Sequence, residues 1–92
     1  MSEILKGDHK FYIGEDEHDP IAEITYKDKD ENTIIADHTY VSEQLRGQGI
    51  AGKLFNELIT FAKEENKKII PLCSYVKVKM EGSPEYEELI GK

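Results

Sequence analysis

The sequence predicts a single α+β domain, residues 1–92, built around a mixed β-sheet, and three observations support this fold class. Three short strand-like segments follow one another in the first half of the chain, separated by turns rich in acidic residues and glycine. One long amphipathic segment begins at Ile50, with apolar residues at spacings of three and four. A short apolar segment follows it, and a length of 92 residues suits one domain.

The three N-terminal segments are predicted to form an antiparallel meander. Residues 10–13 are mainly apolar and aromatic, residues 21–27 alternate between apolar and polar side chains, and residues 33–41 are largely apolar. The charged segment 28–32 between the last two is typical of a hairpin loop. Connections this short join neighbouring strands that run in opposite directions.

The amphipathic segment from Ile50 is predicted to be a helix, and lysines near its end suit the negative pole of a helix dipole. Residues 68–73 are predicted to form the next strand. A helix between two strands implies a right-handed crossover, so this strand should lie parallel to residues 33–41. Because proline cannot donate a ladder hydrogen bond, Pro71 predicts a sheet edge or a break in pairing.

The end of the chain is predicted to be a short helical tail. Residues 74–81 are expected to form a helix with Ser74 as its N-cap and Gly82 at its end. Pro84 then starts a final turn that runs to Ile90. The complete prediction is three antiparallel strands, a crossover helix, one parallel strand and short C-terminal helices.

The charge balance limits the classes of partner. The chain has 12 Lys and Arg residues against 19 Asp and Glu residues, which gives a formal net charge of −7. Nucleic-acid binding needs a basic footprint and is not expected. An acidic surface attracts cations instead, including amines and lysine-rich peptides. The acidic segment 15–19, which includes His18, is expected to be a solvated loop, and no metal site is predicted.

Cysteine usage and hydropathy bear on the compartment. Cys73 is the single cysteine, so no internal disulfide can form, and a lone thiol suits a reducing compartment. A cytoplasmic location is therefore expected. There is no run of 18 apolar residues that would predict a membrane span, and the first six residues lack the apolar core of a signal peptide.

The most informative segment is residues 44–52, in which Gly47, Gly49 and Gly52 lie at the start of the predicted helix. Such a loop exposes backbone N–H groups at a helix N-terminus, where unpaired donors and the helix dipole both favour an anion. It therefore predicts a cradle for phosphate oxygens. The plainer interpretation is a glycine-rich turn that only caps the helix.

The glycines also fit the dinucleotide fingerprint G-x-G-x-x-G, but the context disagrees. That fingerprint directly follows a strand, whereas residues 42–46 intervene here. It also needs an acidic residue about 20 positions later, and residues 69–73 contain no carboxylate. A nucleotide-binding redox domain is therefore the weaker interpretation.

Gln44, Gly47 and Gly49 resemble motif A, Q/R-x-x-G-x-G/A, of the GNAT superfamily of acetyl-CoA-dependent N-acetyltransferases. The preceding strand and the following helix agree with that superfamily. The segments His38-Thr39-Tyr40-Val41, Pro71-Leu72-Cys73 and Pro84-Glu85-Tyr86 resemble a small single-domain group of GNAT-like proteins. The resemblance covers about residues 9–90 and implies the GNAT-type fold.

The resemblance implies that acetyl-CoA is a co-substrate bound where two parallel strands diverge, here the strands that end at Val41 and Cys73. Backbone groups of residues 39–41 would bind the pantetheine arm like an added strand. Amides of residues 46–51 would hold the pyrophosphate, and Arg46 would either add a charged contact or lie free in solvent. The implied cofactor-binding residues are Thr39, Tyr40, Val41, Arg46, Gly47, Gln48, Gly49, Ile50, Ala51 and Gly52.

Acetyl transfer to an amine needs a base for the amine proton, a donor for the oxyanion and an acid for the departing thiolate. His38 is a candidate base, or a half-buried structural histidine, and strand alternation places it on the same face as Ala36 and Tyr40. Cys73 is a candidate acid, a candidate acceptor of the acetyl group, or an inert core thiol. Tyr75 is a weaker candidate acid.

The function implied is transfer of an acetyl group from acetyl-CoA to a primary amine of a small molecule, a lysine or a protein N-terminus. The alternative is a non-catalytic acyl-CoA-binding or interaction module. Two departures from larger GNAT enzymes favour that alternative. Lys79 and Met80 occupy the helix positions where many of those enzymes have a tyrosine acid, and the helices that shape their amine site are missing. The acceptor site is expected to be open or completed by another chain, as in a homodimer.

Overall fold

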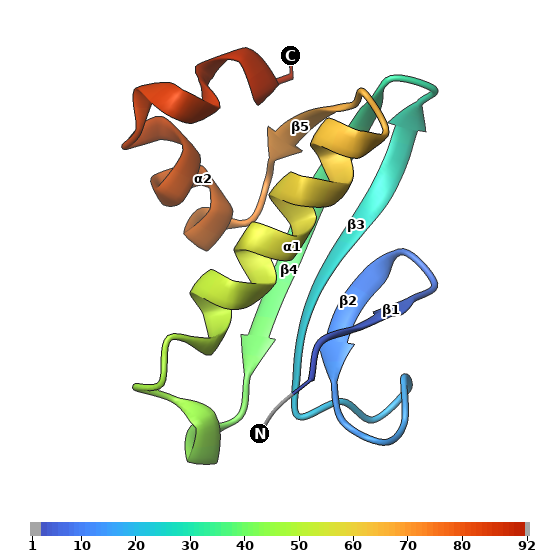
Figure 1. Ribbon diagram of the computed structural model, residues 1–92, viewed down its shortest axis with the longest axis vertical. Helices are drawn as coiled ribbons and strands as arrows, with labels where there is room; N and C mark the ends of the chain where they lie inside the picture. The colour runs from blue at the N-terminus through green and yellow to red at the C-terminus, as the bar shows by residue number, and fades with distance from the viewer. Residues whose placement is uncertain (1–2, 92) are drawn as a thin grey trace.

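The computed structural model describes residues 3–91, which form a five-stranded mixed sheet with the strand order β1-β2-β3-β4-β5 (Figure 1). Helix α1 lies across one face of the sheet, and α2 and the 3-10 segment η2 pack beside β5. No helix in this part of the chain is long and apolar enough to cross a bilayer. The elements are β1 (Leu5–Gly7), β2 (Lys10–Ile13), β3 (Ala22–Asp30), β4 (Thr33–Val41), η1 (Glu43–Leu45), α1 (Ile50–Glu64), β5 (Lys68–Pro71), α2 (Ser74–Glu81) and η2 (Pro84–Leu89).

The architecture confirms the predicted α+β fold class. Strands β1 to β4 pair antiparallel, and β4 pairs with β5 in parallel, with Ile34 opposite Ile69. The observed bounds of β2, β4 and α2 and the observed start of α1 coincide with the predicted ones. The crossover helix α1 therefore connects the two parallel strands, as predicted, because parallel strands need a long connection.

The sheet is larger than the sequence predicts. Strand β1 was not predicted, because its three residues are exposed or half-buried and carry no alternating pattern. Strand β3 runs on to Asp30, so the predicted loop 28–32 shrinks to a turn at Glu31 and Asn32, where the Asn32 amide donates to Asp30 Oδ1 at 2.8 Å. Asp28 and Asp30 pair with β4 although their side chains are exposed, so the polar side chains did not predict this part of the strand.

Two predictions at the end of β5 are wrong. The strand ends at Pro71 and not at Cys73. The Leu72 amide makes the last ladder bond to the Ala36 carbonyl, and the Cys73 amide donates to that same carbonyl instead of continuing along β4. The N-cap of α2 is Cys73 and not Ser74, since Ser74 already has helical geometry. Pro71 does mark the place where pairing stops, as predicted, with Ala36 as its last partner.

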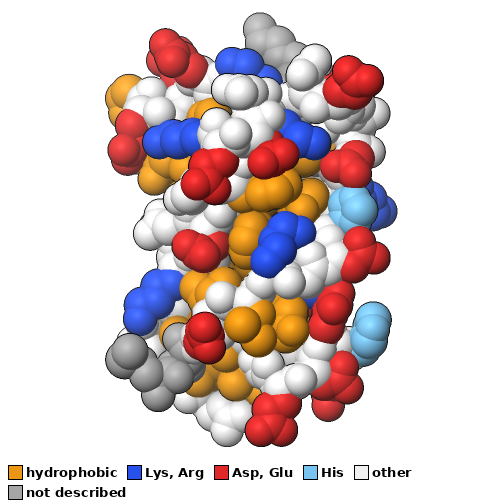
Figure 2. Space-filling view, turned by 45° about the vertical axis from the view of Figure 1, so that its right-hand side comes forward, with side chains coloured by type: hydrophobic (Ala, Val, Ile, Leu, Met, Phe, Trp, Pro, Cys, Tyr) orange, Lys and Arg blue, Asp and Glu red, His pale blue; other side chains and the backbone are white. Residues whose placement is uncertain are grey.

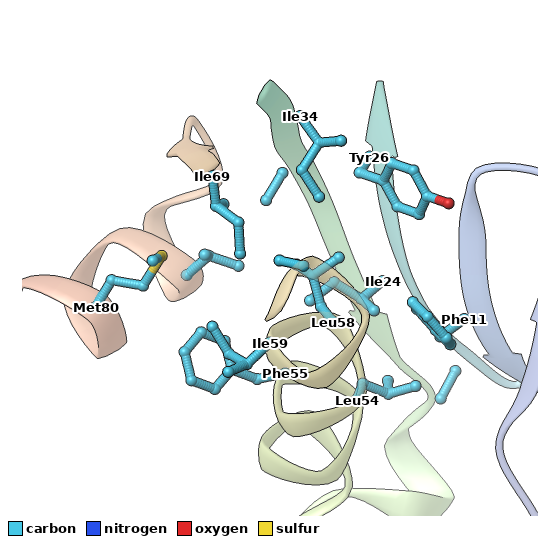
Figure 3. Close-up of a cluster of buried hydrophobic side chains, with 14 of the residues drawn as sticks. Phe11, Ile24, Tyr26, Ile34, Leu54, Phe55, Leu58, Ile59, Ile69 and Met80 are labelled. Carbon is cyan, nitrogen blue, oxygen red and sulfur yellow. The ribbon is translucent and has the colours of Figure 1, made fainter. Parts of the chain in front are cut away.

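One hydrophobic core lies between α1 and the sheet (Figure 3). The helix buries one stripe at spacings of one, three and four residues, and this stripe covers the inner positions of β2, β3, β4 and β5. Helix α2 extends the core past β5 with Val76 and Met80. The fully buried side chains include Ile24, Ile34, Leu54, Phe55, Leu58, Ile69, Val76 and Met80.

Candidate functional site

The glycine loop reaches the N-terminus of α1 through two residues in the left-handed region of backbone space. Gly47 has φ 85° and Gly49 has φ 72°, conformations that L-residues with side chains rarely adopt. A Cβ atom at either position would meet no atom within 4 Å. The turn itself therefore needs glycine at both positions, and the space in front of Gly47 and Gly49 is open.

The first turn of α1 offers unpaired donors to that space. Gly49 is the N-cap of α1 and supplies no side-chain oxygen, and no acidic side chain lies in the first turn. The amides of Ile50, Ala51 and Gly52 thus lack the usual capping partner. A cavity of about 240 Å³ lies there, lined by Val41, Leu45, Arg46, Gly47, Gly49, Ile50, Ala51, Gly52 and Tyr75. The donor set fits a phosphate group.

Most of the predicted cofactor-binding residues line this cavity, but not all do. Arg46 donates from Nε to the Val41 carbonyl at 3.2 Å, which holds the loop against the end of β4. The side chain of Gln48 donates to the Gln44 carbonyl at 3.3 Å, so only the backbone amide of Gln48 is left to bind an anion. Thr39, Tyr40 and Gln48 are outside the lining, whereas Leu45 belongs to it and was not predicted.

A larger cavity of about 450 Å³ lies at the C-terminal end of α2 and is lined by residues 80–84, Glu87 and Ile90. It lies at the N-terminus of η2, but the first turn of η2 carries Glu85 and Glu87, and the two charged side chains that line the cavity are carboxylates, which repel an anion. The smaller cavity has the free amides and the left-handed glycines. The smaller cavity is therefore the candidate anion-binding site.

Strands β4 and β5 separate at the point where the sequence predicts a gap. Their pairing stops at Ala36 and Pro71, after which residues 37–41 of β4 pair only with β3 among the described strands. The edge of β4 that faces away from β3 is therefore free of a partner strand beyond Ala36. An extended chain could add to this edge through main-chain hydrogen bonds.

A bulge in β4 overturns one prediction about His38. Thr25 pairs with His38 and Tyr26 pairs with Ala36, so Asp37 is an extra residue and the alternation of β4 shifts there. His38 consequently shares a face with Tyr40, as predicted, but not with Ala36. The His38 side chain is 56% exposed, and its Nε2 lies 3.8 Å from Glu23 Oε2 on the face of the sheet away from α1.

The same shift turns Thr39 toward Cys73. Thr39 Oγ1 and Cys73 Sγ lie 3.4 Å apart across the gap between the two strands. Thr39 pairs with Ile24, whose side chain is fully buried under α1, so Thr39 belongs to the α1 side of the sheet. The contact between Thr39 and Cys73 was not predicted, because a plain period of two places Thr39 on the other face.

The environment of Cys73 favours its thiolate. Partial burial is the largest influence and raises the pKa of Cys73, but the Thr39 hydroxyl and the amides of Val76, Tyr75 and Thr39 together lower the pKa below its ordinary value. Cys73 is the N-cap residue of α2, so its sulfur lies near the positive end of that helix dipole, which also favours the thiolate. A thiol with a lowered pKa is a better source of nucleophile at neutral pH.

Tyr75 lies in the cavity wall next to the glycine loop. Its hydroxyl is 3.8 Å from the position that a Cβ atom on Gly52 would take, and Lys79 Nζ lies 5.9 Å from its ring centroid. Burial raises the pKa of Tyr75, so the phenol stays protonated and can donate a hydrogen bond. The structure therefore brings together the cavity, Tyr75, Cys73 and Thr39, and leaves His38 on the other face.

Comparisons with known proteins agree with this geometry. The model of the family described as GCN5-related N-acetyl-transferase matches residues 10–89. A GCN5-like protein from Staphylococcus aureus, itself only proposed to be an N-acetyltransferase and solved by NMR, is 45% identical with a TM-score of 0.80, over 97% of this chain and 87% of that chain. A search of curated proteins finds no match.

A second solved structure supports the fold alone. The GNAT family acetyltransferase from Elizabethkingia anophelis, solved with acetyl-CoA bound, is 19% identical with a TM-score of 0.58. The alignment covers 79% of this chain and 50% of that chain, so this chain spans half the length of that enzyme. With the family model covering residues 10–89, the chain belongs to the family of GCN5-related N-acetyltransferases.

Proposed function

We propose that this protein transfers the acetyl group of acetyl-CoA to a primary amine on a small molecule, a lysine side chain or a protein N-terminus. The observation that carries the proposal is the position of Cys73. Its sulfur lies 3.4 Å from Thr39 Oγ1 at the strand gap, and Tyr75, two residues later, lines the cavity at the glycine loop. One elongated molecule with a phosphate at one end and a thioester at the other would occupy both places.

Acetyl-CoA would be held mainly by main-chain groups. Amides of residues 46–51 would bind the pyrophosphate, and Arg46 is close enough to add a charged hydrogen bond. The free edge of β4 at residues 39–41 would pair with the pantetheine amides like an added strand. The thioester would then lie near Cys73, because this residue closes the gap opposite Thr39.

We propose that Cys73 accepts the acetyl group before the amine does. Its thiolate attacks the thioester carbonyl, a C–S bond to Cys73 forms, and the C–S bond to CoA breaks. CoA leaves as a thiolate and takes up a proton. The amine then attacks the acetyl carbon, a C–N bond forms, and Cys73 returns as thiolate while the amine proton passes to a base. The lowered pKa of Cys73 supports this order over a role as acid.

The remaining roles follow from position. The main-chain amide of Val41 would donate to the oxyanion. The Ser42 amide donates to Ile21 beside β3, so alternation turns the Tyr40 amide toward β3 and the Val41 amide toward the edge that has no partner strand. His38 is proposed as the base for an amine that arrives from the face away from α1, where its ring is exposed. Tyr75 is proposed to donate to the bound cofactor instead of acting as the acid. A reactive free thiol requires a reducing compartment, which is consistent with the proposed cytoplasmic location.

Mass spectrometry of the protein with acetyl-CoA, with and without polyamines, aminoglycosides and lysine peptides, tests the proposal. We expect wild-type protein to gain one acetyl group on Cys73 and to lose it to an added amine. The Cys73→Ser variant should bind acetyl-CoA with unchanged affinity and lose turnover by at least about tenfold. Ser74→Ala, one residue away and exposed, is the matched control and should behave as wild type.

The alternative function, a non-catalytic acyl-CoA-binding module, gives a different pattern in the same experiment. The presence of Lys79 and Met80 at the positions of the usual tyrosine acid favours this alternative. In that case the protein would bind acetyl-CoA, but neither Cys73 nor any amine would be acetylated. That outcome would overturn the enzymatic proposal and leave the binding site intact.

A further inference from the structure

The bulge in β4 decides which side chain of the sheet contacts the Cys73 sulfur. β4 has one residue more than β3 at this place, because Tyr26 pairs with Ala36 and Thr25 pairs with His38. Without Asp37 as the extra residue, alternation from Ala36 would turn His38 toward α1 and Thr39 away from it. The 3.4 Å contact between Thr39 Oγ1 and Cys73 Sγ therefore exists only because the bulge is there.

The bulge also anchors the backbone of Cys73. The Ala36 carbonyl, immediately before the extra residue, accepts the Leu72 amide at 3.0 Å and the Cys73 amide at 2.8 Å. The first of these hydrogen bonds is the last one of the β4–β5 ladder, and the second ends the ladder and holds Cys73 at the start of α2. The strand shift at Asp37 thus positions both the thiol and the hydroxyl that contacts it.

The side chain of Asp37 contacts β3 on the face of the sheet that points away from α1. Its Oδ1 accepts a hydrogen bond from Thr25 Oγ1 at 2.6 Å, and its Oδ2 lies 3.6 Å from Lys27 Nζ. Only 19% of the Asp37 side chain is exposed, whereas 75% of the Lys27 side chain is. Thr25 is the β3 residue at the register shift, so this hydrogen bond spans the bulge itself.

We propose that Asp37 is a positioning residue for the reaction: its hydrogen bond with Thr25 fixes the β4 bulge that presents Thr39 and the Ala36 carbonyl to Cys73. Asp37 touches neither the cavity lining nor Cys73 in the described contacts, so it acts through the strand. A carboxylate that is mostly buried needs such a partner, because an unpaired one would be costly. The inference rests on the proposed function only in that Cys73 is the reacting group.

The rate at which iodoacetamide alkylates Cys73, measured as a function of pH, tests the proposal without using acetyl transfer. Asp37→Ala removes the acceptor and Thr25→Val removes the donor at nearly constant shape. We expect both variants to shift the midpoint of the alkylation profile to higher pH, because the Thr39 hydroxyl leaves the sulfur. Alkylation at pH 7 should slow by roughly three- to tenfold.

Two conservative variants separate positioning from general destabilisation. Asp37→Asn keeps an oxygen that accepts from Thr25, and Lys27→Ala removes only the exposed ion pair, so both should keep the wild-type profile. Amide NMR contacts between Thr25 and His38 report the register directly and should disappear in Asp37→Ala. If Asp37→Ala does not fold, Thr25→Val decides the question.

The outcomes distinguish this inference from the proposed function. Folded Asp37→Ala and Thr25→Val variants with an unchanged alkylation profile and unchanged register would overturn the positioning role, whatever the activity. A wild-type protein that never acetylates an amine, combined with the expected shifts, would contradict the proposed function and leave the positioning of Cys73 standing. A variant that melts at a lower temperature but keeps the wild-type alkylation profile also counts against the positioning role of Asp37.

Discussion

Gly49 illustrates how much one residue decides at the scale of a single side chain. It is the N-cap of α1, it has φ 72°, and a Cβ atom there would project into open space next to the first-turn amides. A side chain at this position would therefore occupy the cradle and would also strain the backbone. Asn and Asp tolerate left-handed conformations better than other side chains, which makes them the informative replacements.

We predict that Gly49→Asn weakens acetyl-CoA binding at least about tenfold, and that Gly49→Asp weakens it further because its charge repels the pyrophosphate. Isothermal titration calorimetry measures both affinities, and thermal unfolding checks that the two variants lose similar, small amounts of stability. The pair is matched in size, so the difference between them isolates charge. Wild-type affinity in Gly49→Asp would remove this loop from the binding site.

The sequence predicted the glycine loop and Cys73 from residue types, because a left-handed turn needs glycine and a thiol is chemically distinctive. It could not predict Thr39 as the neighbour of Cys73. Thr39 and Cys73 are 34 residues apart, and their contact depends on a bulge that no local pattern announces. For the same reason His38 was assigned to the wrong face relative to Ala36.

At the scale of elements, helix α1 holds the site by covering the sheet. Leu58 is completely buried. The ring centroid of the neighbouring Phe61 lies 5.2 Å from that of Tyr26 and 5.8 Å from that of Phe11. We predict that Leu58→Ala lowers the free energy of unfolding by about 2–5 kcal/mol, measured by urea denaturation. Asn56→Ala, an exposed change on the same helix, should stay within about 0.5 kcal/mol. Equal effects would mean that α1 is not packed as described.

His9 ties the turn between β1 and β2 to β3. Its Nδ1 lies 2.8 Å from Asp8 Oδ1 and its Nε2 lies 2.7 Å from Asp28 Oδ2. The hydrogen bond to Asp28, followed by the one to Asp8, raises the pKa of His9 above 6.5, and the His9 hydrogen bond lowers the pKa of Asp28. Lys67 and Lys6 also act on Asp28, so this junction is a small charged network.

The sign of the pH dependence follows from these shifts. A raised folded-state pKa means that His9 contributes its full stabilisation below pH 6.5 and loses it as pH rises through that raised value. Asp28 loses its contribution as pH falls through its lowered value. We predict that urea unfolding from pH 6 to 8.5 shows decreasing stability in wild type and a flatter profile in His9→Gln. His18→Gln is the control and should follow wild type; parallel profiles for all three proteins would contradict the prediction.

At the scale of the whole molecule, the surface carries an excess of negative charge. Carboxylates are spread over the face in Figure 2, with fewer lysines between them, in line with the net charge of −7. Self-repulsion of this kind destabilises the compact state and is screened by salt. The excess also favours a cationic binding partner over an anionic one.

We predict that raising the NaCl concentration from about 10 mM to about 150 mM increases the melting temperature at pH 7.5 by a few degrees. The same salt step near pH 4.9, where the formal net charge is close to zero, should have little effect. Differential scanning calorimetry measures both. A larger gain near pH 4.9 than at pH 7.5 would show that net repulsion is not the cause.

The sequence by itself determined the order and type of most elements, the left-handed glycine turn and the membership suggested by its motif, because each of these depends on neighbours within a few residues of one another. Periodicity marks the buried stripe of α1, and glycine marks the left-handed turn. The sequence did not predict strand β1 or the exposed end of β3, because their pairing depends on backbone hydrogen bonds that the side-chain pattern does not reveal.

Only the tertiary structure decided which side chains face one another at the proposed site of reaction. The extra residue in β4 turns Thr39 toward Cys73 and His38 away from it, and the Ala36 carbonyl ends β5. These contacts join residues more than 30 positions apart in the sequence. They depend on the strand register, because one inserted residue moves every following side chain to the opposite face of the sheet. A local pattern carries no information about that register, so the chemistry of the site depends on the assembled sheet.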